Sequence, residues 1–508
     1  MDVIVAGSVR AYTRGMSSIG NHMKAIPTLA TGFISRIGIG RFYKLSQLAV
    51  LSMFMTGPAP AAVAPRADSE LSRQADALLN DYAESGLFTG TVLVARGGRP
   101  VFRKGYGAAS REWMIPNTVG TRYRIGSITK QFTAAAILQM VDQGKLRLDD
   151  PIGNHVSGLP ASWGKATIRQ LLSHTSGVPS YTMMEDFHAR LMPLEHTPKE
   201  LTDLVKNVPL NHEHGTKFDY NNSGYLLLGR IIETVSDMGY ADYLEKKLLE
   251  PLGLRNSGYD DGRTLVAQLA QDYADRKDRV VKSRLVDMSN TYAAGGMYST
   301  VDDLLAWQQM LFEGKVLSPH SLQAMFTDGG HRYGFGWYVR DNLSRRLYEH
   351  GGNIGAYSSL LAYYPDDEVV VIVLSNYGED VVSRITDELA RLALGVAPAY
   401  RQVKVDPRLY GGLEGRYLLD SKEFTISAKG ERLFARLAGQ KELEIFPESE
   451  YRYFFKAVDA LLAFERNPAG KIDAVTLHQN GSTFRARRLD GHAQPKPSTH
   501  QPSGPERK

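Results

Sequence analysis

Four consecutive residues, Ser127 to Lys130, place a hydroxyl and an amine three positions apart, directly before an apolar run from Phe132 to Leu138. Residues three apart share a helix face, so the Lys130 amine can reach the Ser127 hydroxyl if Ser127 opens a helix. A serine becomes a good nucleophile only when a neighbouring base takes its proton, and a helix N-terminus favours a developing negative charge. The pattern therefore predicts acyl transfer through a serine. The alternative is an N-cap serine with a solvated lysine.

A second polar segment, from Tyr220 to Tyr225, leads into the helix-like apolar run Leu226–Ile232. Tyr220 could act as an acid or a base if nearby cations lower its pKa. Asn222 carries both a hydrogen-bond donor and an acceptor. The alternative here is a capped helix start with a tyrosine that only packs.

A third segment joins His350 to Gly351, Gly352 and Asn353, shortly before a predicted strand at Ser359–Tyr364. Two glycines after a histidine let the backbone approach another part of the molecule closely. The alternative is an ordinary glycine-rich bend that enters the strand.

In this order the segments resemble the motifs of the serine β-lactamase and penicillin-binding-protein superfamily, in particular its class C-like branch of serine hydrolases. That family has Ser-x-x-Lys, Tyr-x-Asn and Lys/His-x-Gly motifs, which stand here as Ser127-x-x-Lys130, Tyr220-x-Asn222 and His350-x-Gly352. The likeness covers about residues 70–395 and includes three further segments, Leu171–Gly177, Pro251–Leu254 and Ala294–Thr300.

The resemblance implies a two-step acyl transfer. Ser127 attacks a carbonyl, Lys130 and Tyr220 share the proton transfers, and Asn222 orients Lys130 and the substrate amide. By the same likeness the backbone N–H groups of Ser127 and Asn353 hold the oxyanion, and a water activated by Tyr220 releases the acyl group. Each such donor is typically worth about 2.7–4 kcal/mol of barrier.

His350 also belongs to the implied catalytic set, and Gly352 to the substrate and oxyanion site, but this motif departs from penicillin-recognising members. Those usually have lysine, then Thr or Ser, then glycine. A histidine titrates near neutrality where a lysine stays charged, and Gly351 lacks a hydroxyl that could bind a substrate carboxylate. We therefore expect weak turnover of penicillins and cephalosporins, and substrates that are esters, D-amino-acid amides or small peptides.

The expected function is a serine hydrolase that acts through an acyl-enzyme on a small-molecule or short-peptide amide, ester or lactam. The alternative is a penicillin-binding sensor or scaffold that keeps the site but turns over slowly. No cofactor is expected, and His212-Glu213-His214 lacks the spacing of a zinc site. The motifs select neither the substrate nor the oligomeric state.

Composition narrows the class further. The 508 residues include no cysteine, which excludes disulfides and thiolate catalysis. The formal charge of +5 belongs to the ends, because residues 1–65 carry +5, residues 491–508 carry +2 and the body carries −2. No basic face for nucleic acid follows from this distribution.

Residues 1–65 read as a leader. Basic residues precede an apolar run from Leu45 to Met55, and small residues follow near Ala61 and Ala64, which is the layout of a secretory signal peptide. We expect a periplasmic or secreted protein, or one held at the membrane by an uncleaved segment. Translation from Met23 would shorten the leader, and a mitochondrial presequence is the lesser option.

The predicted fold is α+β: an antiparallel sheet flanked by helices plus an all-helical lobe over residues 66–397, with the site where sheet and lobe meet. We expect a helix at 69–85, a hairpin at 91–102, mostly helix from 127 to 325, strands near 333–339, 359–364 and 369–375, and a helix at 381–394. Short alternating runs from 415 to 489 predict a lipocalin-like β-barrel domain, residues 408–490, before a disordered tail at 491–508. A barrel filled with side chains is preferred over one that holds a ligand.

Overall fold

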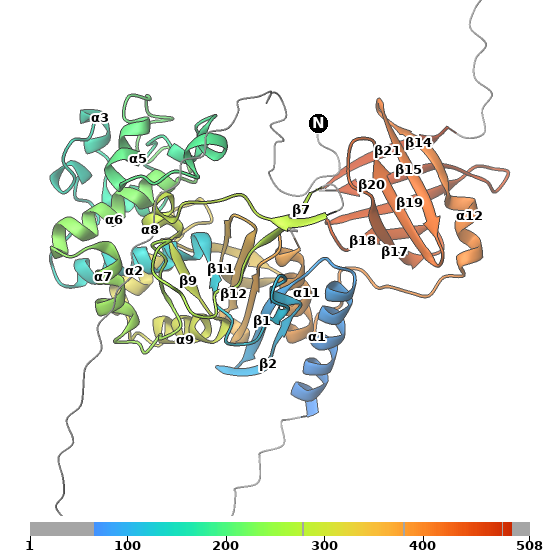
Figure 1. The fold of residues 1–508 in the computed structure, drawn as a ribbon, viewed down its shortest axis with the longest axis horizontal. Helices are drawn as coiled ribbons and strands as arrows, with labels where there is room; N and C mark the ends of the chain where they lie inside the picture. The colour runs from blue at the N-terminus through green and yellow to red at the C-terminus, as the bar shows by residue number, and fades with distance from the viewer. Residues whose placement is uncertain (1–65, 277–278, 379–380, 480, 490–508) are drawn as a thin grey trace, which may run out of the picture. The chain divides into compact units, whose positions relative to one another are not determined.

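The computed structural model describes residues 66–276, 279–378, 381–479 and 481–489. The signal-peptide, anchor and presequence interpretations of residues 1–65 and the tail at 491–508 lie outside these ranges. The described chain is α+β, as predicted, with one six-stranded antiparallel sheet flanked by helices and a closed barrel (Figure 1). Within the described ranges, no helix has the length and apolarity needed to cross a bilayer.

The sheet has the strand order β10-β11-β12-β13-β1-β2, and every neighbouring pair is antiparallel. The two ends of the catalytic region therefore build one sheet, because β1 pairs directly with β13. The strands are β1 (Gly90–Arg96), β2 (Arg99–Tyr106), β10 (Tyr338–Asn342), β11 (Arg345–Ile354), β12 (Tyr357–Tyr364) and β13 (Val369–Ser375).

Both faces of this sheet are covered, and the alternation of side chains along β1 shows it. Leu93 and Ala95 join the core shared with the helical lobe, whereas Val92 and Val94 join the core beneath α1 (Arg66–Glu84) and α11 (Val382–Leu394). Successive residues of a strand point to opposite faces, so a central strand between two cores must be apolar throughout. This accounts for β13, which is buried at every position.

Most helices lie between β2 and β10 in the sequence, as predicted, and α11 follows the strand β13 and packs against it (Figure 1). They are α1 (Arg66–Glu84), α2 (Thr129–Asp142), α3 (Ala161–Gly164), α4 (Ile168–Leu172), α5 (Pro198–Val205), α6 (Asn222–Ser236), α7 (Tyr240–Tyr243), α8 (Tyr292–Gly295), α9 (Val301–Phe312), α10 (Pro319–Phe326), α11 (Val382–Leu394) and α12 (Tyr410–Leu413). The helix α2 is buried on almost all sides, as expected for a helix inside a lobe.

Two details differ from the sequence expectation. The chain between β2 and β10 also contains short strands that were not predicted: β3 (Ala108–Ser110), β4 (Ile115–Pro116), β5 (Tyr123–Arg124), β6 (Gly258–Tyr259), β7 (Tyr273–Arg276), β8 (Arg279–Lys282) and β9 (Met297–Ser299). The strand expected near 333–339 begins only at Tyr338. The residues before it form a turn, because Gly334 N–H donates to Trp337 O at 2.9 Å and Gly336 has φ +76°.

The eight C-terminal strands close into an antiparallel barrel, within the range of alternating runs from 415 to 489 that predicts one. They are β14 (Gly415–Leu419), β15 (Lys422–Lys429), β16 (Arg432–Leu437), β17 (Leu443–Ser449), β18 (Arg452–Phe455), β19 (Ala460–Arg466), β20 (Ile472–Gln479) and β21 (Ser482–Arg488). The interior holds a core of its own that includes Tyr417, Phe424, Tyr453 and Phe464. Packed aromatic side chains of this size fill an eight-stranded barrel.

The barrel core offers a matched test of buried hydroxyls. Tyr453 Oη is buried without a hydrogen-bond partner in the described chain, whereas Tyr417 Oη donates to Leu413 O at 2.7 Å. We expect Tyr453→Phe to leave the free energy of unfolding unchanged or raise it by up to about 1 kcal/mol, since it removes an unsatisfied polar group. Tyr417→Phe should lower it by about 1 kcal/mol. Urea unfolding followed by circular dichroism measures both, and a larger loss of stability in Tyr453→Phe than in Tyr417→Phe would contradict this account.

Candidate active site

Ser127 lies in a single 3-10 turn, Gly126–Ile128, that leads into α2 at Thr129. The serine therefore precedes the helix by one turn instead of opening it. Gly126 has φ +49°, and a Cβ there would lie 2.8 Å from Asn353 N. Only glycine permits both the backbone conformation and the contact. The turn holds Ser127 partly exposed while the helix behind it is buried.

Lys130 is 0% exposed, and its ammonium nitrogen lies within hydrogen-bonding distance of three oxygens. These are Ser127 Oγ at 3.0 Å, Asn222 Oδ1 at 2.9 Å and Ala294 O at 2.8 Å. None of these partners is charged. Burial without a carboxylate partner holds the pKa of Lys130 well below its ordinary value.

The identity of these oxygens decides what a neutral Lys130 can do. The Asn222 and Ala294 carbonyl oxygens can only accept, so they take both N–H bonds of an uncharged amine. The nitrogen lone pair is then left for the Ser127 hydroxyl, the one partner that can donate. This arrangement is that of a general base and its nucleophile.

Tyr220 and Asn222 flank Asn221, the N-cap of α6, whose Oδ1 accepts from Gly224 N–H at 2.8 Å. The cap therefore fixes both neighbours at the start of a buried helix. Asn222 Nδ2 donates to Thr182 Oγ1 at 3.0 Å, which orients its carbonyl toward Lys130. The Lys130 nitrogen lies 4.9 Å from the Tyr220 ring centroid. Burial raises the pKa of Tyr220.

The third motif reaches Ser127 through the backbone of β11. The edge strand β10 pairs with β11 only as far as Glu349, which leaves the outer edge of β11 open from His350 onward. The turn that holds Ser127 lies against one face of β11 at Gly352, because a side chain at that position would point directly at the turn. A Cβ on Gly352 would lie 2.0 Å from Ile125 O and 2.6 Å from Ser127 N. The Gly352–Asn353 backbone therefore lies directly against that of Ser127, where two N–H groups could serve one oxyanion.

His350 is buried, with its Nε2 3.1 Å from Tyr333 Oη and its Nδ1 2.6 Å from Gly351 O. Its ring centroid lies 6.1 Å from that of Tyr220. Desolvation, and then the charge of Lys130, lower the pKa of His350 to about 3. The expectation that this residue titrates near neutrality is therefore wrong, because the motif alone does not show that the imidazole is buried.

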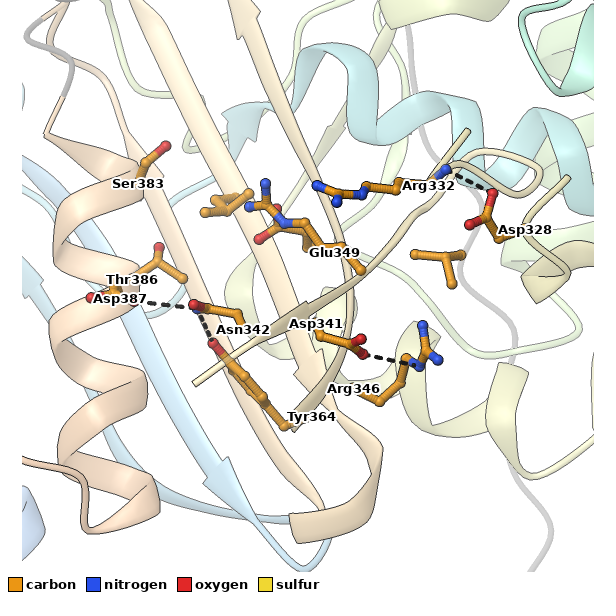
Figure 2. Close-up of a pocket in the computed structure, with 13 residues that line it drawn as sticks. Asp328, Arg332, Asp341, Asn342, Arg346, Glu349, Tyr364, Ser383, Thr386 and Asp387 are labelled. Carbon is orange, nitrogen blue, oxygen red and sulfur yellow. Dashed lines mark hydrogen bonds and ion pairs between the residues drawn. The ribbon is translucent and has the colours of Figure 1, made fainter. Parts of the chain in front are cut away.

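The opposite face of β11 lines a separate polar cavity of about 670 Å³ (Figure 2). Glu349 faces this cavity and forms an ion pair with Arg340, while Asn342 Nδ2 donates to Tyr364 Oη at 3.0 Å. Because neighbouring residues of a strand point to opposite faces, Glu349 and His350 serve different surroundings. None of the residues predicted for the active site lines this cavity.

The structure thus brings together Ser127, Lys130, Tyr220, Asn222 and His350, with the Gly352–Asn353 backbone beside them. Sequence reasoning missed three contributors: Thr182, the Ala294 carbonyl and Tyr333. His174 also packs in this cluster, with its ring centroid 4.4 Å from that of Tyr220. Backbone carbonyls and lone aromatic residues carry no sequence signal of this kind. Within the described ranges, no group of three or more His, Asp or Glu side chains could hold a metal ion.

A family model described as Beta-lactamase matches residues 73–395. The chain belongs to the β-lactamase family. The match spans the sheet, the helical lobe and all three motifs, and it makes the chain a hydrolase of the serine β-lactamase and penicillin-binding-protein superfamily. The barrel follows the matched residues.

Individual relatives support the same family assignment. Penicillin-binding protein 4* of Bacillus subtilis (strain 168) is 27% identical over 444 residues, which are 81% of this chain and 97% of that protein. An octameric penicillin-binding protein homologue from Pyrococcus abyssi matches with a TM-score of 0.61 and 27% identity over 81% of this chain and 99% of its own. A D-stereospecific amidohydrolase from Streptomyces sp. matches with a TM-score of 0.55 and 27% identity over 65% of this chain and 98% of its own.

The contact between β11 and the Ser127 turn can be tested with a single methyl group. Gly352→Ala should lower kcat/KM by about 100-fold or more, because its Cβ would push two rigid backbones apart and misplace an oxyanion donor. Gly351→Ala is the matched control, since the nearest atom to its Cβ would be Ser359 O at 3.2 Å. It should lose only a few-fold. Equal losses in the two variants would contradict the role given to Gly352.

The buried imidazole also predicts a pH dependence of stability. His350 has a folded pKa of about 3 against about 6.5 when unfolded, so below pH 6.5 the unfolded chain binds a proton that the folded chain does not. The free energy of unfolding should therefore decrease as the pH is lowered. His350 should contribute about 2 kcal/mol of this decrease between pH 7 and pH 5. His350→Gln should remove that part of the slope, and His478→Gln on the exposed side of β20 should not. Denaturant midpoints at several pH values measure both.

Proposed function

We propose that this protein is a serine hydrolase that cleaves amides, and esters in the same way, through an acyl-enzyme on Ser127. One observation carries the proposal: the buried Lys130 nitrogen faces the Ser127 hydroxyl while its two other partners are obligate acceptors. A base prepared in this way needs neither a histidine nor a carboxylate.

In the first step the Ser127 proton moves to Lys130 and a bond forms between Oγ and the substrate carbonyl carbon. The negative charge gathers on the carbonyl oxygen, next to the backbone N–H groups of Ser127 and Asn353. The tetrahedral intermediate then collapses, and the bond to the leaving nitrogen or oxygen breaks. Tyr220 delivers a proton to the leaving group and is reprotonated from Lys130, whose nitrogen lies beneath its ring. Neither residue has a net change in protons.

In the second step water attacks the acyl-enzyme. Tyr220 and Lys130 now accept the proton of the water and return one to Ser127, by the reverse of the first relay. Ser127, Tyr220 and Asn222 all keep some exposure to solvent, which this water requires. The acid product leaves and the free serine is restored.

We place the substrates among D-amino-acid amides, short D-amino peptides and esters, with weak turnover of penicillins and cephalosporins. The likeness to the Streptomyces D-stereospecific amidohydrolase supports the amide class. The uncharged, buried His350 supports the expectation of weak turnover of penicillins and cephalosporins. It supplies no positive charge to a substrate carboxylate, whereas penicillin-recognising members have a lysine at this position.

Active-site labelling and a substrate series test the proposal on the full chain. A fluorophosphonate probe should label the protein once, and Ser127→Ala should abolish both labelling and hydrolysis. Ser173→Ala, which alters a serine outside the site, should change neither. Lys130→Met should lower kcat at least about 1000-fold, since it removes the base and leaves its neighbours unpaired.

A D-amino-acid p-nitroanilide and a p-nitrophenyl ester should turn over, and nitrocefin should turn over slowly. Hydrolysis that survives Ser127→Ala would reject the mechanism. Rapid nitrocefin turnover would reject the substrate assignment alone. A labelled adduct that persists without product would instead identify a slow-turnover sensor.

A further inference from the structure

Tyr333 lies outside the three motifs, yet its hydroxyl reaches the active-site histidine. The side chain is 1% exposed, and Oη lies 3.1 Å from His350 Nε2. It belongs to the turn before β10, in which a Cβ on Gly336 would lie 2.7 Å from Lys130 O. The turn is therefore held tightly against the first residues of α2, the helix that follows Ser127.

The direction of the Tyr333–His350 hydrogen bond follows from the other side of the ring. His350 Nδ1 is 2.6 Å from Gly351 O, and a carbonyl oxygen can only accept, so Nδ1 carries the hydrogen. Desolvation and the nearby Lys130 keep the imidazole neutral, which leaves Nε2 without a hydrogen. Tyr333 must then donate its O–H to Nε2. The hydrogen bond from Nδ1–H to Gly351 O fixes the imidazole tautomer, and this tautomer makes Nε2 the acceptor of the hydrogen bond from Tyr333.

The second hydrogen bond acts on the peptide that precedes the oxyanion site. The Gly351 carbonyl belongs to the peptide plane shared with Gly352, and a Cβ on Gly352 would lie 2.6 Å from Ser127 N. Ser359 Oγ lies 2.8 Å from Ile125 O and 3.1 Å from Gly352 O, which ties the same two backbones together. A rotation of the Gly351 carbonyl would therefore move the backbone from which the Asn353 N–H projects.

The surroundings of Tyr333 hold its ring in one place. Its centroid lies 4.8 Å from that of His174, 5.6 Å from Phe218 and 4.8 Å from Tyr338. His174 in turn accepts a hydrogen bond from Asn221 N–H at 3.1 Å, at the cap that positions Asn222. A ring packed in this way loses little entropy when its hydroxyl binds.

We propose that Tyr333 is a positioning residue for the hydrolysis: through His350 it fixes the β11 backbone against which the oxyanion forms. The inference rests on the proposed acyl-enzyme function. His350 then acts as a neutral, doubly hydrogen-bonded strut, and it neither exchanges protons with substrate nor supplies charge.

The first test is Tyr333→Phe in the full chain, with a substrate that the wild type hydrolyses. We expect kcat and kcat/KM to fall together, by about 3- to 10-fold for one lost hydrogen bond, with KM unchanged. A boronic acid that forms a tetrahedral adduct on Ser127 should bind more weakly by the same factor. Long-range proton–nitrogen spectra of histidine-labelled protein should show the Nδ1–H tautomer of His350 in the wild type and its loss in the variant.

Two comparisons separate positioning from a general loss of structure. Tyr338→Phe alters a ring 5.3 Å from the His350 centroid that has no hydrogen bond to it in the described chain, and it should leave kcat and boronate affinity unchanged. In a His350→Ala background, Tyr333→Phe should have no further effect, because the residue through which it acts is gone. This cycle stays informative even if Tyr333→Phe is less stable.

Additive losses in the cycle, a change in KM alone, or an unchanged boronate affinity would overturn the inference. Those outcomes leave Ser127-dependent hydrolysis intact. Failure of the proposed function would look different, since Ser127→Ala would then retain activity and no boronate adduct would form.

Discussion

The desolvated amine of Lys130 is the constraint on which the rest of the site depends. An ammonium group surrounded by apolar helices and uncharged oxygens loses hydration that no carboxylate restores, so its free energy favours the neutral form. That form can act as a base at neutral pH, provided that its two hydrogens have fixed acceptors. The N-cap of α6 supplies the first acceptor through Asn222, and the short helix α8 supplies the second through Ala294. The burial of α2 is therefore a requirement of the chemistry as much as of the fold.

The same burial explains the character of the surrounding side chains. Tyr220, Tyr225, Tyr333 and His174 pack around Lys130 and His350, and desolvation keeps the tyrosines protonated and both histidines neutral. Among the described residues of this cluster, Lys130 is then the group whose charge changes most readily, whereas Tyr220 can only pass a proton on as it receives another. A charged lysine in place of His350 would oppose the charge of Lys130 across the same low-dielectric space. A neutral histidine at this position adds no second positive charge beside Lys130.

Close contacts between main-chain segments also position the groups of the site. At Gly126 and Gly352 the two chains approach so closely that a methyl group on either would meet main-chain atoms. A contact of this kind fixes the two backbones more rigidly than flexible side chains could, and oxyanion stabilisation depends on that rigidity.

Much of this protein can be read from residue types and their spacing. The α+β class, the helices at both ends of the sheet, the eight barrel strands and the convergence of Ser127, Lys130, Tyr220 and Asn222 all follow from local patterns and a family likeness. Such patterns repeat with the period of a helix or strand, or lie within one short segment. They therefore reflect interactions between residues that are close in the sequence. The residues from Tyr333 to Val339 predict a strand from local pattern, whereas a tertiary contact with α2 makes the first of them a turn.

Only the tertiary structure decided the protonation of the site. A sequence shows that residue 350 is a histidine, but its pKa depends on how much water the fold removes and on the distance to Lys130. The Ala294 carbonyl and the Tyr333 hydroxyl belong to residues that are unremarkable in sequence, and they matter because folding places them beside the amine and the imidazole. Desolvation and long-range hydrogen bonds are properties of the packed chain, so no reading of local pattern could have assigned them.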